Sequence, residues 1–289
     1  MIKNTIKTYV LMAALGGLLV LIGGGIWGGS GATIGLGIGL LFVGGSYWFS
    51  DKIAIKTSRA KPLDERDAPG VYRIMRALTT SAGMPMPRLY ITPDQQPNAF
   101  ATGRNEKKAV VAVTTGITKV LTEDELKGVL AHELAHVRNR DILIGSVAAA
   151  IAMGITLVAR MAMWAGMFGG FGGGDDDDGM NPIALIALII LAPLAAFLIQ
   201  MAISRSREYE ADRLGAKLSG SGEPLARALE KLHAGAQKIP MRVDPAQENK
   251  FIVSPLSGPT AKRTAFASMF MTHPPVEERI RRLRSPLLV

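Results

Sequence analysis

Residues 122–136 read TEDELKGVLAHELAH, and the stretch ends with two of the chain's four histidines, placed four positions apart. Residues i and i+4 share one face of a helix, so the imidazoles of His132 and His136 can reach the same ion. Glu133 follows the first histidine and falls where it can accept a proton from water activated by that ion. This HExxH spacing is typical of zinc hydrolases.

The residues before the histidines predict that the stretch is helical. Thr122 and Glu125 have the spacing of a capping box, in which each side chain satisfies a backbone N–H at the helix start. Apolar residues then recur at helical spacing, at Leu126, Val129, Leu130 and Leu134. A buried amphipathic helix with two incidental histidines is the alternative, so the rest of a metal site must be sought elsewhere in the chain.

A catalytic zinc ion needs three protein ligands and one open position. The chain has no cysteine, so the third ligand must be His, Asp or Glu, and such a site also suits manganese or cobalt. Glu208 is the strongest candidate, because Asp212 lies one helical turn later and can hydrogen-bond the far nitrogen of a ligand histidine. Alternatively, these two acids belong to a charged helix and pair with its arginines, Arg205, Arg207 and Arg213.

The apolar residues, 48% of the chain, are concentrated in four nearly uncharged blocks. The blocks cover Val10–Trp27, Thr33–Phe49, Ile142–Ala159 and Pro182–Ile203. Each approaches the ~20 residues that cross the ~30 Å hydrocarbon core of a bilayer, although a buried core helix is the alternative for the first. We therefore expect two transmembrane hairpins, residues 1–50 and 142–203, which separate two catalytic parts, residues 51–141 and 204–289.

Lysine and arginine are distributed unevenly around these blocks. The loops at residues 28–32 and 161–181 have neither, whereas the opposite flanks hold Lys3, Lys7, Lys52, Lys56, Arg138, Arg140, Arg205 and Arg207. By the positive-inside rule, both termini and both catalytic parts are cytoplasmic. The formal net charge of +9 suits anionic lipid headgroups, and no basic-aromatic pattern predicts nucleic-acid binding. Gly31, Gly35 and Gly39 predict close helix contact in a membrane or, alternatively, a flexible hairpin.

The two catalytic parts contain both helical and strand patterns. Helices are expected at Asp64–Ser81, Arg205–Leu218, Pro224–Gln237 and Pro275–Arg284, and strands at Arg88–Thr92, Asn98–Thr102 and Ala109–Thr114. The last two strands flank a polar turn, which predicts a hairpin. Ile239–Thr260 is rich in proline and polar residues and is expected to be a mobile loop.

Four motifs, in this order, resemble those of the HtpX membrane metalloproteases, which are relatives of the CAAX prenyl endopeptidases among the gluzincin-type zinc proteases. They are NAFATG at residues 98–103, HELAH at 132–136, SRSREYEAD at 204–212 and HPPVEER at 273–279. The third fits loosely, and residues 168–181 are the least family-like. The resemblance implies a mainly α integral membrane protein, with four transmembrane helices and a cytoplasmic gluzincin-like α+β zinc protease domain with a small β-sheet.

The resemblance also implies residue roles. One Zn²⁺ per chain would be bound by His132, His136 and Glu208. Glu133 would be the general base, and Asp212 would hydrogen-bond a ligand histidine.

Three further expectations concern residues around this centre. His273 and Arg279 would lie over the site and polarise the substrate carbonyl; alternatively, they begin a structural helix that has a surface arginine. An extended substrate would pair with an edge strand formed by Asn98, Ala99, Phe100 and Ala101, unless this is an ordinary half-buried strand. His233 matches no motif and is expected at the surface.

The expected function is that of a zinc metalloendopeptidase, multi-pass in the bacterial cytoplasmic (inner) membrane with a cytoplasmic active site. His136 lies six residues before the third apolar block and Glu208 five after the fourth, which favours substrates at that membrane face. Misfolded or damaged membrane proteins and unfolded polypeptides would be cut in quality control and stress response, alongside other quality-control proteases. The alternatives are a CAAX-type processing protease, a site-2-type intramembrane protease or a non-catalytic membrane scaffold or chaperone.

Overall fold

The computed structural model describes residues 51–52, 54–103, 105–141, 206–238 and 274–285, together with part of residues 13–49. The chain divides into two compact units. Unit 1 contains Met1, Phe49–Leu143 and Met201–Val289, and unit 2 contains Ile2–Trp48 and Ile144–Gln200. The second predicted hairpin at 142–203, the segment Ile239–Thr260 and His273 lie outside the described residues, so the expectations for them stay predictions.

Unit 1 contains a four-stranded sheet in the order β1-β2-β4-β3. The strands are β1 (Lys61–Pro62), β2 (Arg88–Thr92), β3 (Ala99–Thr102) and β4 (Val110–Thr114). β2 and β4 are parallel, and the other two pairs are antiparallel. All five residues of β4 are buried, as its continuous run of valines and small residues requires of an inner strand. The predicted hairpin of β3 and β4 is confirmed, with the short 3-10 helix η1 (Glu106–Lys108) in its turn, and β3 is an edge strand.

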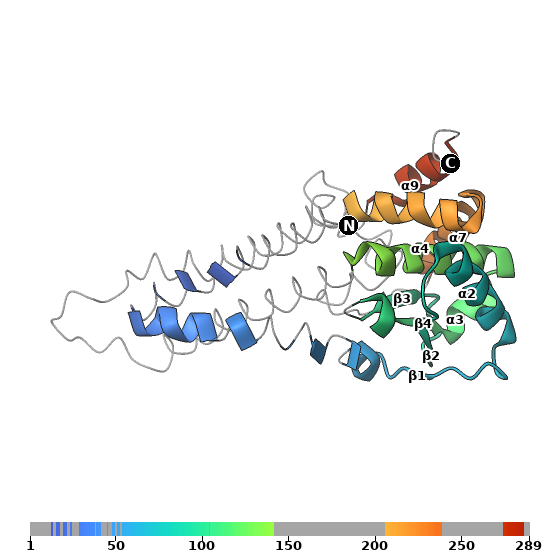
Figure 1. The fold of residues 1–289 in the computed structure, drawn as a ribbon. Coiled ribbons are helices and arrows are strands. Elements are labelled where there is room, and N and C mark those ends of the chain that lie inside the picture. The colour runs from blue at the N-terminus through green and yellow to red at the C-terminus, as the bar shows by residue number, and fades with distance from the viewer. Residues whose placement is uncertain are drawn as a thin grey trace. The chain divides into compact units, whose positions relative to one another are not determined.

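Helices pack beside this sheet (Figure 1). They are α2 (Pro69–Ala82), α3 (Thr115–Val120), α4 (Glu123–Asn139), α7 (Glu223–Lys238), α9 (Val276–Leu283) and a further helical stretch at residues 206–219. The predicted helices are confirmed with shifted ends: α2 begins at Pro69, not at residue 64, because proline suits the first helical turn. The short elements α3 and β1 were not predicted, since neither is long enough to show a period.

α4 carries both histidines of the HELAH motif and lies at the centre of unit 1. Its capping box is confirmed, because Glu125 N–H donates to Thr122 Oγ1 and Thr122 N–H donates to Glu125 Oε2. Lys231 of α7 pairs with the buried Glu125 at 2.8 Å. The helix ends where Arg140 adopts a left-handed conformation with φ of 59°. These two ends place His132 and His136 in the last turns of a well-anchored helix.

Two glycines let the neighbouring helices approach α4 closely. A Cβ atom at Gly128 would lie 2.5 Å from Leu225 N, so α4 and α7 meet there backbone to backbone. A Cβ atom at Gly215 would lie 3.0 Å from both Cα and N of His132. The helix at residues 206–219 therefore packs against α4 at the level of the first histidine. The predicted metal site requires the SRSREYEAD and HELAH motifs to meet, but no sequence pattern indicated that Gly215 would make the contact.

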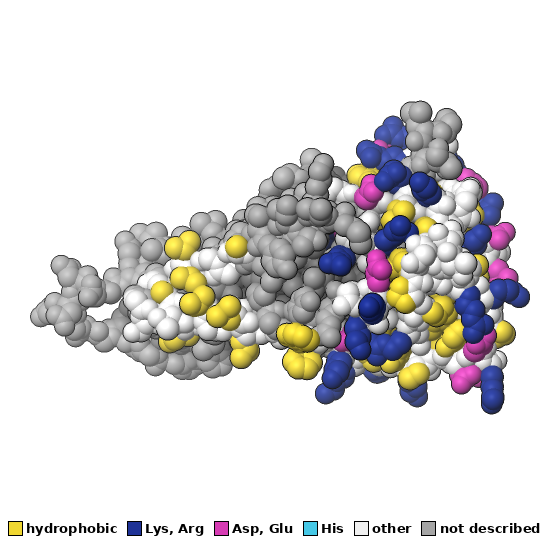
Figure 2. Space-filling view, viewed as in Figure 1, with side chains coloured by type: hydrophobic (Ala, Val, Ile, Leu, Met, Phe, Trp, Pro, Cys, Tyr) yellow, Lys and Arg dark blue, Asp and Glu magenta, His cyan; other side chains and the backbone are white. Residues whose placement is uncertain are grey.

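In unit 2, residues 29–37 and 39–41 are helical, and Gly31, Gly35 and Gly39 are all buried. The large apolar residues around them are between 51% and 72% exposed: Ile34, Leu36, Leu40 and Leu41. Figure 2 shows hydrophobic side chains on the surface of this part of the chain. The glycine row is thus the packed face of this helix, the reverse of an ordinary soluble amphipathic helix. Within the described residues, no helix is both long and apolar enough to cross a membrane.

Candidate metal centre and active site

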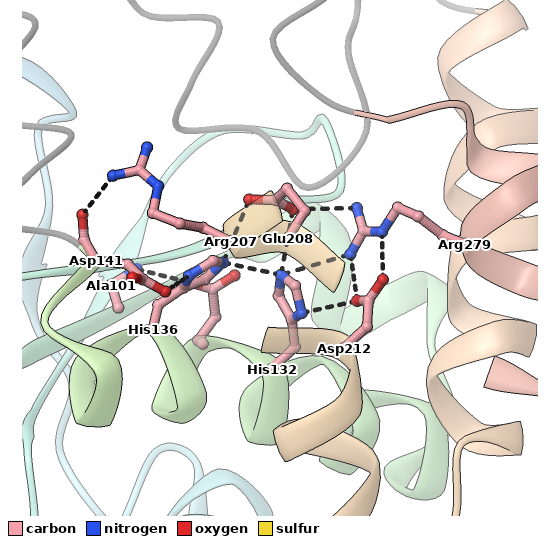
Figure 3. Close-up of polar contacts among 9 residues, drawn as sticks. Ala101, His132, His136, Asp141, Arg207, Glu208, Asp212 and Arg279 are labelled. Carbon is pink, nitrogen blue, oxygen red and sulfur yellow. Dashed lines mark hydrogen bonds and ion pairs between the residues drawn. The ribbon is translucent and has the colours of Figure 1, made fainter. Parts of the chain in front are cut away.

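Three side chains from two helices converge on one point. His132, His136 and Glu208 each offer an atom that lies within 4.8 Å of the others. The Nε2 atoms of the two histidines are 3.1 Å apart, and Glu208 carboxylate oxygens lie 3.6 Å from His132 Nε2 and 3.4 Å from His136 Nε2. Figure 3 shows Glu208 above the two rings, which are edge to face. The i, i+4 spacing of the histidines therefore brings both imidazoles to one point, as predicted.

The far nitrogen of His132 is held by Asp212. Asp212 Oδ1 lies 3.0 Å from His132 Nδ1, and both residues are buried. Arg279 of α9 donates to the same carboxylate twice, from Nη2 at 2.7 Å and from Nε at 2.9 Å. This forked ion pair is the geometry in which arginine binds carboxylates most strongly. His132 is thus supported by residues from two other segments of the chain.

The far nitrogen of His136 is held by Asp141, which sequence reasoning did not identify. Asp141 Oδ2 lies 3.1 Å from His136 Nδ1, and Asp141 is buried. Arg207 Nη1 donates to the main-chain oxygen of Asp141 at 3.2 Å. A sequence signal did exist: an aspartate five residues after the second histidine can reach back over the end of the helix. Each histidine therefore has its own carboxylate partner, and each partner has its own arginine (Figure 3).

This arrangement fits a bound divalent cation. A neutral imidazole whose Nδ1–H donates to a carboxylate keeps its lone pair on Nε2, so both lone pairs meet at one point. With both histidines neutral, the carboxylates of Glu133, Asp141, Glu208 and Asp212 contribute −4 and the guanidiniums of Arg207 and Arg279 contribute +2, leaving a formal charge of −2. The site strongly favours positive charge. Burial lowers the pKa of His136, but the carboxylates of Asp141 and Glu208 raise it to about 10.

Glu133 points from α4 toward the edge strand. Its Oε2 accepts a hydrogen bond of 2.9 Å from the backbone N–H of Ala101 in β3. Burial raises the pKa of Glu133, and the nearby Glu208 charge acts in the same direction, whereas the two histidines and the Ala101 N–H oppose the shift. A raised pKa makes a carboxylate a stronger base, which suits a group that accepts a proton in catalysis.

The backbone of β3 presents hydrogen-bonding groups on its outer side. Thr114 N–H donates to Asn98 O at 2.9 Å, and bonded pairs alternate with non-bonded pairs along antiparallel strands. The N–H and C=O groups of Ala99 and Ala101 therefore point away from β4, and the bond from Ala101 to Glu133 agrees with this direction. The side chains of Ala99 and Phe100 are buried, so the strand offers its backbone rather than its side chains.

The remaining predicted residues behave differently from one another. Arg279 is completely buried, so the alternative of a surface arginine is wrong. Its guanidinium contacts Asp212, lies 3.4 Å from Glu208 Oε2 and lies 3.5 Å from His132 Nε2, and its role toward a substrate carbonyl stays a prediction. His233 is half-buried, and its Nε2 lies 3.9 Å from Oε1 of the exposed Glu277.

The alternative of a simple charged helix for the SRSREYEAD motif is also wrong. Glu208 and Asp212 are buried and face the histidines. The surface ion pair of this helix joins Arg213 to Glu210 at 2.7 Å instead. The motif therefore separates its acids by face, two toward α4 and one toward solvent.

Comparison with known proteins agrees with this geometry. The model of Peptidase family M48 matches residues 65–287. The Protease HtpX homolog of Syntrophobacter fumaroxidans is 53% identical over 281 residues, covering 96% of this chain and 98% of that protein. The Protease HtpX homolog of Pelotomaculum thermopropionicum is 52% identical over 286 residues, covering 98% of this chain and 99% of that protein.

A solved structure shares the fold. The crystal structure of S. mikatae Ste24p matches 98% of this chain with a TM-score of 0.55 and 22% sequence identity, and the match spans 65% of that chain. At this identity the likeness concerns the fold alone. The resemblance stated from the motifs is thus confirmed: the chain belongs to peptidase family M48 and is a zinc metalloprotease of the HtpX kind, with a cluster of His132, His136 and Glu208 that fits the metal.

Proposed function

We propose that this protein is a membrane-anchored endopeptidase that cuts misfolded or damaged polypeptides in membrane quality control. The observation that carries the proposal is the hydrogen bond from Ala101 N–H to Glu133. This bond joins the candidate general base to the outer edge of β3, so the proton acceptor and a peptide-binding edge meet beside the metal donors. A protease needs these three parts within reach of one scissile bond.

His132, His136 and Glu208 would hold the zinc ion. When bound, zinc polarises the substrate carbonyl and lowers the pKa of a water molecule toward about 7. Glu133 accepts the proton of the attacking water and later donates it to the departing amine. The hydrogen bond from Ala101 keeps the Glu133 carboxylate turned toward the strand, where the substrate backbone would lie. His273 and Arg279 are proposed to assist the carbonyl oxygen, as the family resemblance implies.

Recognition through β3 favours unfolded substrates. The outward N–H and C=O groups of Ala99 and the C=O group of Ala101 can bond to the backbone of any extended peptide, while the Ala101 N–H is bonded to Glu133. Asn98 and Phe100 fix the strand against β4. Backbone pairing has little dependence on side-chain sequence, and only an unfolded segment can offer a free extended backbone. Such a site selects by conformation, which is the property that quality control needs.

The membrane location is part of the proposal. We expect two transmembrane hairpins, residues 1–50 and 142–203, and cytoplasmic catalytic parts, residues 51–141 and 204–289, in the bacterial inner membrane. The helical residues 29–37 and 39–41 support this, because their large apolar side chains are exposed while Gly31, Gly35 and Gly39 are buried. Exposed apolar surface of this kind is stable against lipid, where helices associate through small residues. Lipids and other quality-control proteases are the proposed partners.

The experiment uses full-length protein in nanodiscs and two versions of one membrane substrate, a native form and a destabilised form. We expect zinc-dependent cleavage of the destabilised form at several sites, little cleavage of the native form, and no cleavage with a chelator or with Glu133→Gln. Equal cleavage of both forms at one defined site would favour a processing protease of the CAAX type. Cleavage that survives in Glu133→Gln would overturn the proposed active site, and zinc binding without any cleavage would favour a scaffold.

A further inference from the structure

We infer that Asp141 and Arg207 form a positioning pair that sets the orientation of His136 in the metal centre. The inference rests on the proposed function of that centre, but it concerns how the ligand is held rather than what is cleaved. Neither residue belongs to the donor set, and neither is part of the His132–Asp212–Arg279 arrangement. Their effect would therefore be read in metal affinity and coordination geometry.

Asp141 is placed to control the ring of His136. Arg140 adopts a left-handed conformation directly after α4, and this turn brings the following residue back over the end of the helix. Asp141 is buried, and its Oδ2 lies 3.1 Å from His136 Nδ1. A carboxylate at Nδ1 fixes both the tautomer and the rotation of the ring, so the lone pair on Nε2 faces the metal.

His136 depends on such a hydrogen bond more than His132 does. The side chain of His132 is 2% exposed, whereas that of His136 is 14% exposed. Packing from α4 and from the helix at residues 206–219 restrains the first ring, and Gly215 marks the close contact there. The second ring has less packing, so a directed contact must supply the restraint.

Arg207 holds Asp141 in place from the other ligand helix. Its Nη1 donates to the main-chain oxygen of Asp141 at 3.2 Å, while the next residue, Glu208, faces the two histidines. Adjacent residues on one helix thus serve two purposes, a donor to the metal and a clamp on the end of α4. A half-buried guanidinium loses hydration, and a carbonyl at a helix end is a suitable partner because it carries partial negative charge.

The test measures Zn²⁺ affinity of the full-length protein by chelator competition, and the Co²⁺ absorption spectrum of the same variants. We expect Asp141→Ala to weaken zinc binding about 10- to 100-fold and to alter the Co²⁺ spectrum. Asp141→Asn keeps an acceptor oxygen and should lose less. Arg207→Met should weaken binding about 2- to 10-fold, the usual effect of one hydrogen bond. Asp124→Asn and Arg213→Met, exposed changes on the same two helices, are the matched controls.

A double variant tests whether Arg207 acts through Asp141. If it does, Asp141→Ala with Arg207→Met should bind zinc no more weakly than Asp141→Ala alone. Wild-type affinity and an unchanged Co²⁺ spectrum in Asp141→Ala would overturn the inference, and so would fully additive losses in the double variant. Thermal unfolding of each metal-free variant separates a lost fold from a lost contact. Because the readout is metal binding, a wild-type protein that binds zinc but cuts nothing would refute the proposed function and leave this result interpretable.

Discussion

The two histidines are chemically alike but are supported in different ways. His132 is held by Asp212 and Arg279, which come from two distant segments, and it is buried. His136 is held by Asp141, only five residues away, and it is more exposed. The first support can form only when the helix at 206–219 and α9 have both docked, whereas the second starts from the end of α4 and needs only Arg207 of the helix at 206–219 besides. One metal centre thus combines a long-range support with a local one.

The largest effect should come from a residue that belongs to neither support. Glu133→Gln removes the proton acceptor but leaves both histidines and Glu208 in place. We expect the catalytic constant to fall by ~100- to 10,000-fold, with the zinc content unchanged. Steady-state kinetics on an unfolded peptide and metal analysis of the same sample check this. Loss of zinc in this variant would mean that Glu133 is itself a ligand.

The next largest effect should come from removing the ligand that the two histidines share. Glu208→Ala takes away one of three donors, so zinc occupancy and activity should both fall. The matched control is Glu210→Ala in the same helix, because Glu210 is exposed and pairs with Arg213. The control should keep its zinc. Full occupancy in Glu208→Ala would show that the third donor lies elsewhere.

Breaking the long-range support should cost fold stability as well as metal. Arg279→Met leaves the buried Asp212 carboxylate without its forked partner, and such a change typically destabilises by ~3–5 kcal/mol. Arg279 holds the pKa of Asp212 below its ordinary value even though burial opposes this. Arg281→Met, an exposed change in the same helix whose ion pair is with Glu278 of α9 itself, is the control. Chemical denaturation of both variants measures the difference; equal stability would mean that α9 docks without the ion pair.

The smallest expected effect concerns the close contact that sets the long-range support. In Gly215→Ala the new methyl group would lie 3.0 Å from His132 Cα and N, so the two helices must separate by a few tenths of an ångström. Zinc affinity should fall by less than about 10-fold, because alanine favours the helix by ~1 kcal/mol and offsets part of the strain. Gly235→Ala, where the added atom meets nothing within 4 Å, is the control. Tighter zinc binding in Gly215→Ala would contradict the proposed role of this contact.

Short sequence patterns predicted the features of the metal centre that depend only on residues close together in the chain. The capping box at Thr122 and the i, i+4 spacings of His132 with His136 and of Glu208 with Asp212 follow from helix geometry, which any short window contains. The strands β2, β3 and β4 were predicted from alternation and turn residues for the same reason. Asp141 was missed because its effect depends on the left-handed turn at Arg140, and arginine gives no sign of that conformation in a sequence.

The sequence by itself determined which residues could bind a metal and which of the longer segments would be helices or strands. Only the tertiary structure decided which of those residues contact one another. Arg279 is buried on Asp212 because α9 packs against α7, and Ala101 bonds to Glu133 because β3 packs against α4. Periodicity in a sequence describes one helix or strand at a time. Whether a charged side chain is buried, and which residue the outer backbone groups of an edge strand face, depends on which elements pack together.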